Sequence, residues 1–392
     1  ARPDCHGGFA QLLTMRAFAT VFRSRLRAPS DARRASVLVV VLVTLVLATI
    51  ALTLFIERAT DDLLVETREA DARRLRLEAY SALETTLAVL QDFKLVNGGL
   101  HSPAEGWGDP LEWAGYTPQG RRRVTVSFED ESGKLSLPKT THDTFVTLFE
   151  AWGLVKSDAE RLSDALQQWA NPDYVPTSGL DPDYEREKLP YLAPGRTMRS
   201  FPELRAIAVA RELLFDEAGQ PNKLYQRFAT TVSLLSYSSS NLNAAPGGTL
   251  TAYGMDEAKQ ALVSDYLLGR GSYRSRGAGF FRNDGEVSQV LGISAPTGLG
   301  LEIQALRIRV TVSEGGGEFQ LSVVISPNGG ATAVTDKAKT RREDGTTPTV
   351  SSGVEVAKPT ETSALNYPFT LLEIRENEEP LRLPETEEKD PS

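Results

Sequence analysis

Cysteine and histidine are nearly absent from this chain of 392 residues. It contains one cysteine, Cys5, and three histidines, which excludes an internal disulfide framework, a zinc ribbon and a metal cluster built mainly from these residues. The net charge of −9 argues against a nucleic-acid binder that depends on phosphate attraction. Motifs of the G-x-S-x-G, P-loop and G-x-G-x-x-G types do not occur in the sequence either. The composition therefore indicates a structural or binding role, and we expect no catalytic residues and no enzyme activity.

Charge, glycine and proline are all missing from residues 36–56. As a helix, this run spans about 30 Å, which is the thickness of the hydrocarbon core of a bilayer. The sequence has no second run of this kind, so we expect a single-pass membrane protein. Basic residues dominate before the run and acidic residues after it. The positive-inside rule then places the N-terminus in the cytoplasm and the body, from Glu57 on, across the membrane.

The apolar run is expected to remain as an anchor. It is longer than the hydrophobic region of a removable signal peptide, and it ends at Phe55 and Ile56 rather than at small residues. Residues 1–35 before it form a basic cytoplasmic leader, in which Met15 is the expected start and residues 1–14 are an overextension.

Residues 36–97 are expected to form one helix, because no glycine or proline interrupts them. Beyond the membrane run, apolar residues recur every three or four positions, which is typical of an amphipathic helix that packs on a domain. The glycines at 98 and 99 are expected to end the helix. The alternative is an anchor followed by a linker coiled coil. The stripe consists of Leu75, Ala79, Leu83, Leu87 and Leu90.

Alternating apolar residues predict a small antiparallel sheet, and the pattern between its first and second strands is helical, so the fold class is α+β. Residues 98–130 and 301–375 then form a sheet domain, into which a helical domain of residues 131–300 is inserted. Residues 327–363 are expected to be an exposed loop, and residues 376–392 an acidic disordered tail. The expected strands are 123–128, 306–312, 319–325 and 369–374, with a turn at 313–318, and the expected helices are 141–155, 158–170, 201–216, 221–230 and 255–268.

Five short motifs follow one another along the insert. They are Asp-Glu-Ser-Gly-Lys-Leu at 130–135, Trp-Gly-Leu at 152–154, Asp-Ala-Leu-Gln-Gln-Trp at 164–169, Phe-Pro-Glu-Leu at 201–204 and Asn-Leu-Asn-Ala-Ala at 241–245. In this order they resemble the minor pseudopilin K family of type II secretion systems (general secretion pathway protein K), within the type IV pilin-like superfamily. The resemblance covers residues 33–374. It implies a pilin-like long N-terminal helix, transmembrane in its first third, packed on a small antiparallel sheet, with a large all-helical insert.

The resemblance also implies a function and a set of partners. Such a protein lies in the bacterial inner membrane, caps the tip of the periplasmic pseudopilus, and contributes to pseudopilus assembly and to the export of folded proteins across the outer membrane. The expected partners are the minor pseudopilins I and J, the major pseudopilin, the inner-membrane secretion platform and prepilin peptidase. The alternative is a single-pass, membrane-anchored periplasmic adaptor or helix-hairpin-helix binding protein that is not part of a filament.

The helix-hairpin-helix alternative rests on the Asn-Leu-Asn-Ala-Ala motif at 241–245, which resembles the start of such modules. In DNA-binding modules a glycine-rich turn offers backbone amides to phosphate. Here the following turn carries Asp256, an acid at the place where phosphate would approach. We therefore expect no nucleic-acid partner.

The family resemblance implies cleavage by prepilin peptidase between Ala35 and Ser36. The leader of such proteins usually ends in glycine, and here the matching residue is Ala35. Most pilin-like subunits carry a glutamate at the fifth mature position, which counted from Ser36 is Val40. A non-acidic residue at this position is expected for a subunit at the tip of the filament.

The resemblance further implies calcium in the insert, where carboxylates gather in a proline-rich loop. Calcium takes six to eight oxygen ligands, but no EF-hand spacing is present. The chain departs from the family at Gln168, where aspartate is usual, and at residues 178–181. The alternative is a solvated acidic loop without metal. The candidate ligands are Asp173, Asp181, Asp183, Glu185 and Glu187.

Overall fold

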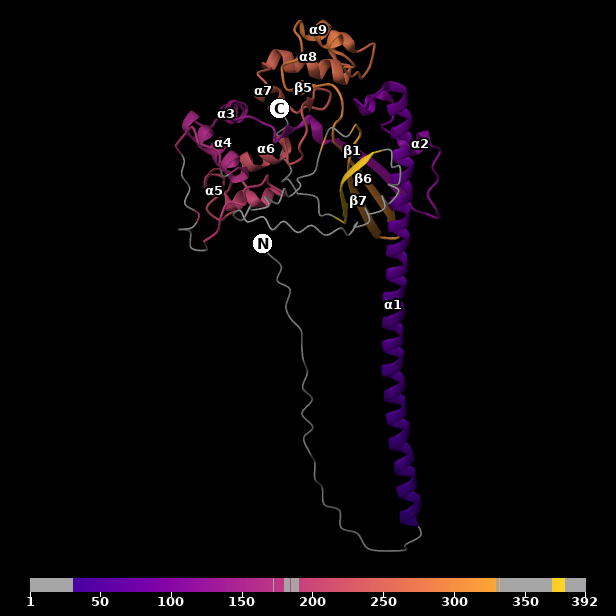
Figure 1. The fold of residues 1–392 in the computed structure, drawn as a ribbon. Coiled ribbons are helices and arrows are strands. Elements are labelled where there is room, and N and C mark those ends of the chain that lie inside the picture. Colours follow the sequence, from indigo (N-terminus) through magenta and orange to yellow (C-terminus); the bar gives the residue numbers. More distant parts are fainter. Residues whose placement is uncertain are drawn as a thin grey trace, which may run out of the picture. The chain divides into compact units, whose positions relative to one another are not determined.

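The computed structural model describes residues 31–171, 173–179, 184, 190–328, 331 and 369–377. The chain divides into two compact units, Ala1–Glu69 and Ala70–Ser392. Helix α1, Asp31–Asn97, contributes its first part to the first unit and its last part to the second (Figure 1). The single helix predicted for residues 36–97 is therefore confirmed, and it begins five residues earlier than expected.

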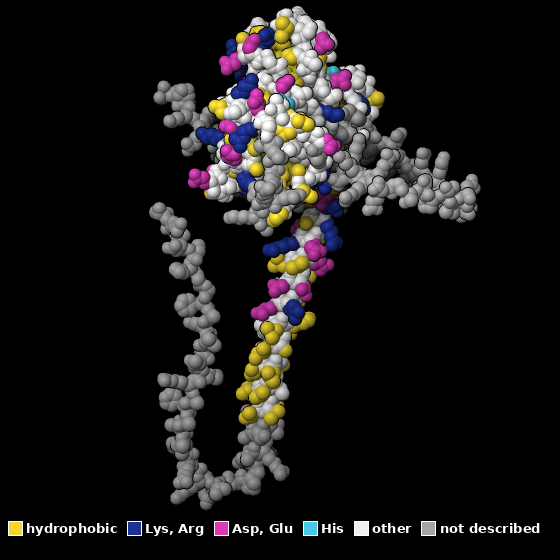
Figure 2. Space-filling view, turned by 60° about the vertical axis from the view of Figure 1, so that its left-hand side comes forward, with side chains coloured by type: hydrophobic (Ala, Val, Ile, Leu, Met, Phe, Trp, Pro, Cys, Tyr) yellow, Lys and Arg dark blue, Asp and Glu magenta, His cyan; other side chains and the backbone are white. Residues whose placement is uncertain are grey.

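The first unit is represented by residues 31–69 of α1. Its apolar side chains from Val39 to Ile56 are 50–70% exposed. In Figure 2 they form a yellow surface along the described part of this segment. Within the described residues, α1 is the one helix that is long and apolar enough to cross a membrane, with a mean hydropathy of 3.0 over 18 residues. This agrees with the predicted single-pass anchor.

The second unit contains the predicted antiparallel sheet, with the strand order β1-β6-β7-β8. Strands β6 and β7 are joined by Gly315 and Gly316, both at positive φ (57° and 92°). Two consecutive positive φ angles define a type I′ turn, which matches the twist of a hairpin. The α+β class is confirmed, and the strands are β1 (Arg123–Asp130), β6 (Leu306–Glu314), β7 (Gly317–Ser326) and β8 (Thr370–Glu376).

One face of this sheet packs against the last part of α1 (Figure 1). The predicted stripe of α1, from Leu75 to Leu90, is at most 5% exposed. It contacts the inward side chains of the central strands, among them Ile308, Val310 and Val323. Burial of large aliphatic side chains contributes about 1.5–3 kcal/mol each, so this core fixes the last turns of α1 on the sheet.

The expected helical insert contains two hydrophobic cores. One holds Phe145, Phe149 and Phe228 together, and the other holds Tyr266 and Phe281. The helices of the first core are α3 (His142–Ala151), α4 (Lys156–Ala170), α5 (Ala208–Leu214) and α6 (Lys223–Thr231), with the 3-10 helix η4 (Phe201–Ala206), and those of the second are α8 (Glu257–Leu268) and α9 (Asp284–Leu291). Helix α7 (Gly247–Ala252) contributes Ala252 to the first core and Leu250 to the second.

Short elements connect these parts. They are η1 (Pro103–Glu105), α2 (Pro110–Trp113), η2 (Glu131–Gly133), η5 (Gly271–Tyr273) and two parallel pairs, β2 (Leu135–Ser136) with β3 (Val232–Ser233) and β4 (Ser240–Asn241) with β5 (Leu299–Gly300).

Three expectations for the insert differ from the structure. The helix predicted for 201–216 is split, because Ile207 is extended (φ −87°, ψ 116°). The helix predicted for 141–155 ends at Ala151, before Gly153 at φ +95°. Helices α7 and α9 were not expected, since six and eight residues are too few for a clear helical period.

Candidate functional site

The last part of α1 has one face that no other described element covers. Leu77 and Leu95 are each 71% exposed, and the side chains between them at the same helical spacing are small or polar and exposed. This face lies opposite the stripe that packs on the sheet. We call it the open face of α1, and it consists of Leu77, Ser81, Glu84, Ala88 and Leu95.

A buried ion pair holds α1 in its orientation. Glu78 Oε2 accepts a hydrogen bond from Arg122 at 2.7 Å, and Glu78 Oε1 accepts one from the Tyr116 hydroxyl at 2.6 Å. Arg122 also pairs with Glu314 on β6 at 3.1 Å. Burial alone would raise the pKa of Glu78, but the hydrogen bonds from Tyr116 and Arg122 bring it below its usual value. The charged pair therefore fixes which face of α1 points outward.

Two of the five family-like motifs meet at the base of the insert. Asn241 Nδ2 donates to Asp130 Oδ2 at 2.6 Å and to the His101 carbonyl at 2.9 Å. Asp130 also caps the following turn through the Ser132 amide at 2.9 Å. A Cβ on Gly133 would lie 2.5 Å from the Ala244 carbonyl oxygen, so only glycine fits there. The motifs at 130–135 and 241–245 thus form one junction between sheet and insert.

Paired charges surround this junction. Lys134 bridges Glu129 and Glu131 at 2.6 and 3.0 Å, while Arg307 pairs with Glu131 at 2.7 Å and Arg309 with Glu129 at 2.6 Å. Burial would raise the pKa of Glu129, but Lys134 and Arg309 lower it to about 2. Each charge in this set is neutralised within the fold, so the set is structural.

Asp164, the first residue of the motif at 164–169, is fully buried. Its Oδ2 accepts hydrogen bonds from the amide and hydroxyl of Ser178 at 2.7 and 2.6 Å. Its Oδ1 accepts one from the Tyr174 hydroxyl at 2.7 Å and lies 3.1 Å from His142 Nδ1. Burial opposes the charge, but the bonds from Ser178 and Tyr174 lower the pKa of Asp164. We call these four residues the Asp164 cluster.

The Asp164 cluster includes the start of the loop that carries the predicted calcium ligands. Tyr174 and Ser178, in this part of the loop, donate hydrogen bonds to Asp164. Both carboxylate oxygens of Asp164 are already hydrogen-bonded, so they do not fit a calcium ligand. Within the described residues, no group of three or more acidic, histidine or cysteine side chains is arranged to hold a metal. Asp173 is exposed, and the other four candidate ligands lie outside the described residues, namely Asp181, Asp183, Glu185 and Glu187.

The predicted processing residues lie on α1, within the first unit. The backbone of Ala35 and Ser36 belongs to the first turns of α1. Val40, the predicted fifth mature residue, has an exposed fraction of 59%.

The motif residues Trp169 and Leu204 are buried in the first helical core. The structure therefore assigns them to packing.

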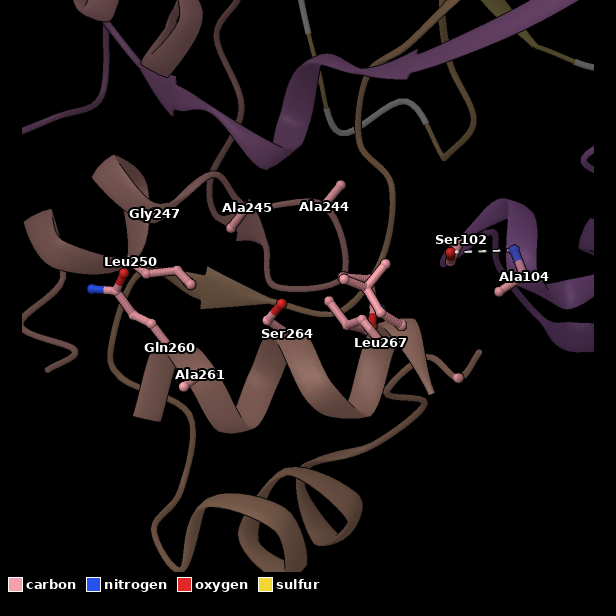
Figure 3. Close-up of a pocket in the computed structure, with 13 residues that line it drawn as sticks. Ser102, Ala104, Ala244, Ala245, Gly247, Leu250, Gln260, Ala261, Ser264 and Leu267 are labelled. Carbon is pink, nitrogen blue, oxygen red and sulfur yellow. Dashed lines mark hydrogen bonds between the residues drawn. The ribbon is translucent and has the colours of Figure 1, made fainter. Parts of the chain in front are cut away.

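A groove that the sequence did not predict lies beside α8 (Figure 3). It has a volume of about 640 Å³. Its walls come from α8, from the start of α7 and the turn before it, and from the segment after α1. We call it the α8 groove. Its lining includes Ser102, Ala104, Ala244, Ala245, Gly247, Leu250, Gln260, Ala261, Ser264, Leu267, Leu268 and Gly279.

Comparison with known proteins gives one match to a protein family. Residues 129–235, which include four of the five motifs, match the model of the family described as type II secretion system (T2SS), protein K. A search of curated proteins found no match. Among solved structures, a chain of the GspK-GspI-GspJ complex from the type 2 secretion system of enterotoxigenic Escherichia coli is similar over 66% of this chain and 92% of its own, with 16% identity and a TM-score of 0.46. Residues 129–235 are therefore similar in sequence to the type II secretion system protein K family.

Proposed function

We propose that this chain is a minor pseudopilin that caps the tip of the periplasmic pseudopilus of a type II secretion system. It is anchored in the bacterial inner membrane with its N-terminus in the cytoplasm, and it contributes to pseudopilus assembly and to the export of folded proteins across the outer membrane. The observation that carries the proposal is the open face of α1. It occurs in a chain whose residues 129–235 match the protein K family, and whose α1 includes a segment long and apolar enough to span a membrane.

The open face has the composition of a helix-packing surface. Its positions recur at intervals of three, four or seven residues, so they lie on one side of the helix. Ser81 and Ala88 allow a second helix to approach closely, and Leu77 and Leu95 offer apolar contacts above and below them. Because the ion pair between Glu78 and Arg122 fixes this face outward, it is available to the helices of pseudopilins I and J.

Val40 supports a position at the tip. In the family picture, a glutamate at the fifth mature position neutralises the terminal amine of a neighbouring subunit inside the apolar bundle, where an unpaired charge is costly. Val40 has no charge to offer such a neighbour. The chain is therefore suited to the one place where no further subunit is stacked above it.

The direct test of processing is mass spectrometry of the N-terminal peptide, with prepilin peptidase present and absent. We expect the mature chain to begin at Ser36 when the peptidase is present and to keep Arg34 and Ala35 when it is absent. An anchor that retains its leader in the presence of an active peptidase contradicts the proposal and favours the adaptor outside the filament.

The test of partnership is co-purification of the full-length chain from detergent-solubilised membranes with pseudopilins I and J. We expect a complex with one copy of each protein. Recovery of this chain alone, or its polymerisation without I and J, would argue for a different role.

A further inference from the structure

The α8 groove is built from small side chains around an apolar floor. In Figure 3, Ser264 and Leu267 of α8 point toward the turn that carries Ala244 and Ala245. Leu250 of α7 closes one end. Small residues on facing walls leave room for another chain, and the leucines offer it apolar contacts.

A loop rich in arginine borders the groove. We call residues 269–282 the arginine loop, because four arginines lie within it. All four side chains are exposed, and within the described part of the chain none forms an ion pair with a carboxylate. By contrast, the arginines of the sheet, such as Arg307 and Arg309, are neutralised by glutamates. The four are Arg270, Arg274, Arg276 and Arg282.

Arg276 is held at the rim of the groove. Its guanidinium lies 4.5 Å from the centre of the Tyr266 ring, which is the distance of a cation–π contact. A Cβ on Gly279, a residue that lines the groove, would lie 3.4 Å from Arg276 Nη2. The loop is closed at its base by the hydrogen bond from the Gly279 amide to the Leu267 carbonyl, at 3.1 Å. This positive charge is thus fixed before any ligand arrives, which lowers the ordering cost of binding.

We propose that the α8 groove and the arginine loop bind a short segment of a partner protein that combines acidic and apolar side chains. The apolar side chains enter the groove between α7 and α8, and a carboxylate pairs with Arg276. A planar guanidinium fits a carboxylate through two parallel hydrogen bonds. The groove favours a peptide over a lipid headgroup, because a headgroup needs only the charges and not the apolar cleft. The α8 groove shares no residue with the open face of α1, so this inference does not rest on the proposed function.

The test uses the full-length chain in detergent micelles and a fluorescein-labelled peptide of twelve residues in which aspartate alternates with leucine and serine. Binding is followed by fluorescence anisotropy. We expect saturable binding, and at least tenfold weaker binding of the same peptide with asparagine in place of aspartate. Arg276→Gln should weaken the binding of the aspartate peptide at least tenfold. The control Arg227→Gln, which removes an exposed charge from α6, should change it less than twofold.

A second pair of variants separates the groove from the charge. Ala261→Trp fills the groove and should also weaken binding at least tenfold, while Ala258→Trp, on an exposed part of α8 outside the groove, should not. The inference is overturned if the aspartate peptide does not bind at millimolar concentration, or if the asparagine peptide binds equally well. It is also overturned if Arg276→Gln and Ala261→Trp leave the affinity unchanged. Binding of phosphatidylglycerol vesicles that depends on Arg276 but not on Ala261, without peptide binding, would identify the loop as a lipid contact instead.

Discussion

Replacing Glu78 by glutamine tests how the second unit fixes α1. The variant keeps the size of the side chain and one oxygen for Tyr116, but it presents an amide NH2 to Arg122, where the native oxygen accepts at 2.7 Å. Hydrogen bonds to charged groups contribute about 1.5–3 kcal/mol. Arg122 keeps its pair with Glu314, so we expect a loss near the lower end, about 2 kcal/mol.

Hydrogen exchange of the full-length chain in detergent micelles reports this loss locally. Peptides from residues 75–93 should exchange roughly 30-fold faster in the variant, because about 2 kcal/mol is lost and each 1.4 kcal/mol corresponds to a tenfold change. A peptide from residues 156–170 of α4 should exchange at the native rate. The matched control is Glu84→Gln, which removes the same charge from the open face and should change exchange by less than twofold.

The pH dependence provides a second readout of the same pair. Because the pKa of Glu78 is lowered in the folded chain, its stabilising effect is present above its ordinary value of 4.5 and is lost as the pH falls through the folded pKa. The protection of α1 amides relative to their intrinsic exchange rates should therefore fall on acidification of the native chain, and the protection in Glu78→Gln should depend less on pH. Equal exchange of native chain and variant at pH 7 would refute the assignment of Glu78 as the residue that fixes α1.

Four further outcomes are expected. Ala88→Arg on the open face should abolish co-purification with pseudopilins I and J, while Ala258→Arg should not, and unchanged recovery of both variants would exclude this face. Asp164→Asn should destabilise the first helical core by about 2–3 kcal/mol, as measured by urea unfolding. Because the pKa of Asp164 is lowered in the folded chain, this difference in stability between the native chain and the variant should disappear as the pH falls. Burial raises the pKa of Asp130 to about 6 from 3.8, so its contribution to stability falls as the pH rises from about 4 to 6, and melting curves of Asp130→Asn should lack this slope. The calcium prediction for Asp173, Asp181, Asp183, Glu185 and Glu187 requires that a chelator lower the melting temperature and that calcium restore it, and a native melting curve in chelator would contradict it.

The long helix and the sheet could be predicted because their patterns repeat within short stretches of sequence. The stripe from Leu75 to Leu90 has a helical period over four turns, and β6 and β7 alternate strictly around a turn with two glycines. Such local regularity depends little on the rest of the chain. The predicted ends differ by a few residues, since caps and turns decide them.

The sites depend on contacts that no local pattern contains. Asp130 and Asn241 are 111 positions apart, so a motif at each position gives no sign that they meet. The arginine loop was visible as four arginines within residues 270–282, but their lack of carboxylate partners among the described residues is a property of the fold. Asp164 did give a signal, because an aspartate among the apolar positions of an amphipathic helix must find hydrogen-bond donors.

The most direct test of the central claim is the position of this chain on isolated pseudopili. In a chain processed at Ser36, a cysteine introduced at the exposed Ala258 is the one cysteine of residues 36–392, because Cys5 lies before the cleavage site. It can then be labelled with gold and located by electron microscopy. If the chain is a minor pseudopilin that caps the tip, we expect one label at one end of each filament. Labels distributed along the filaments, or their absence from filaments that assemble normally, would contradict it.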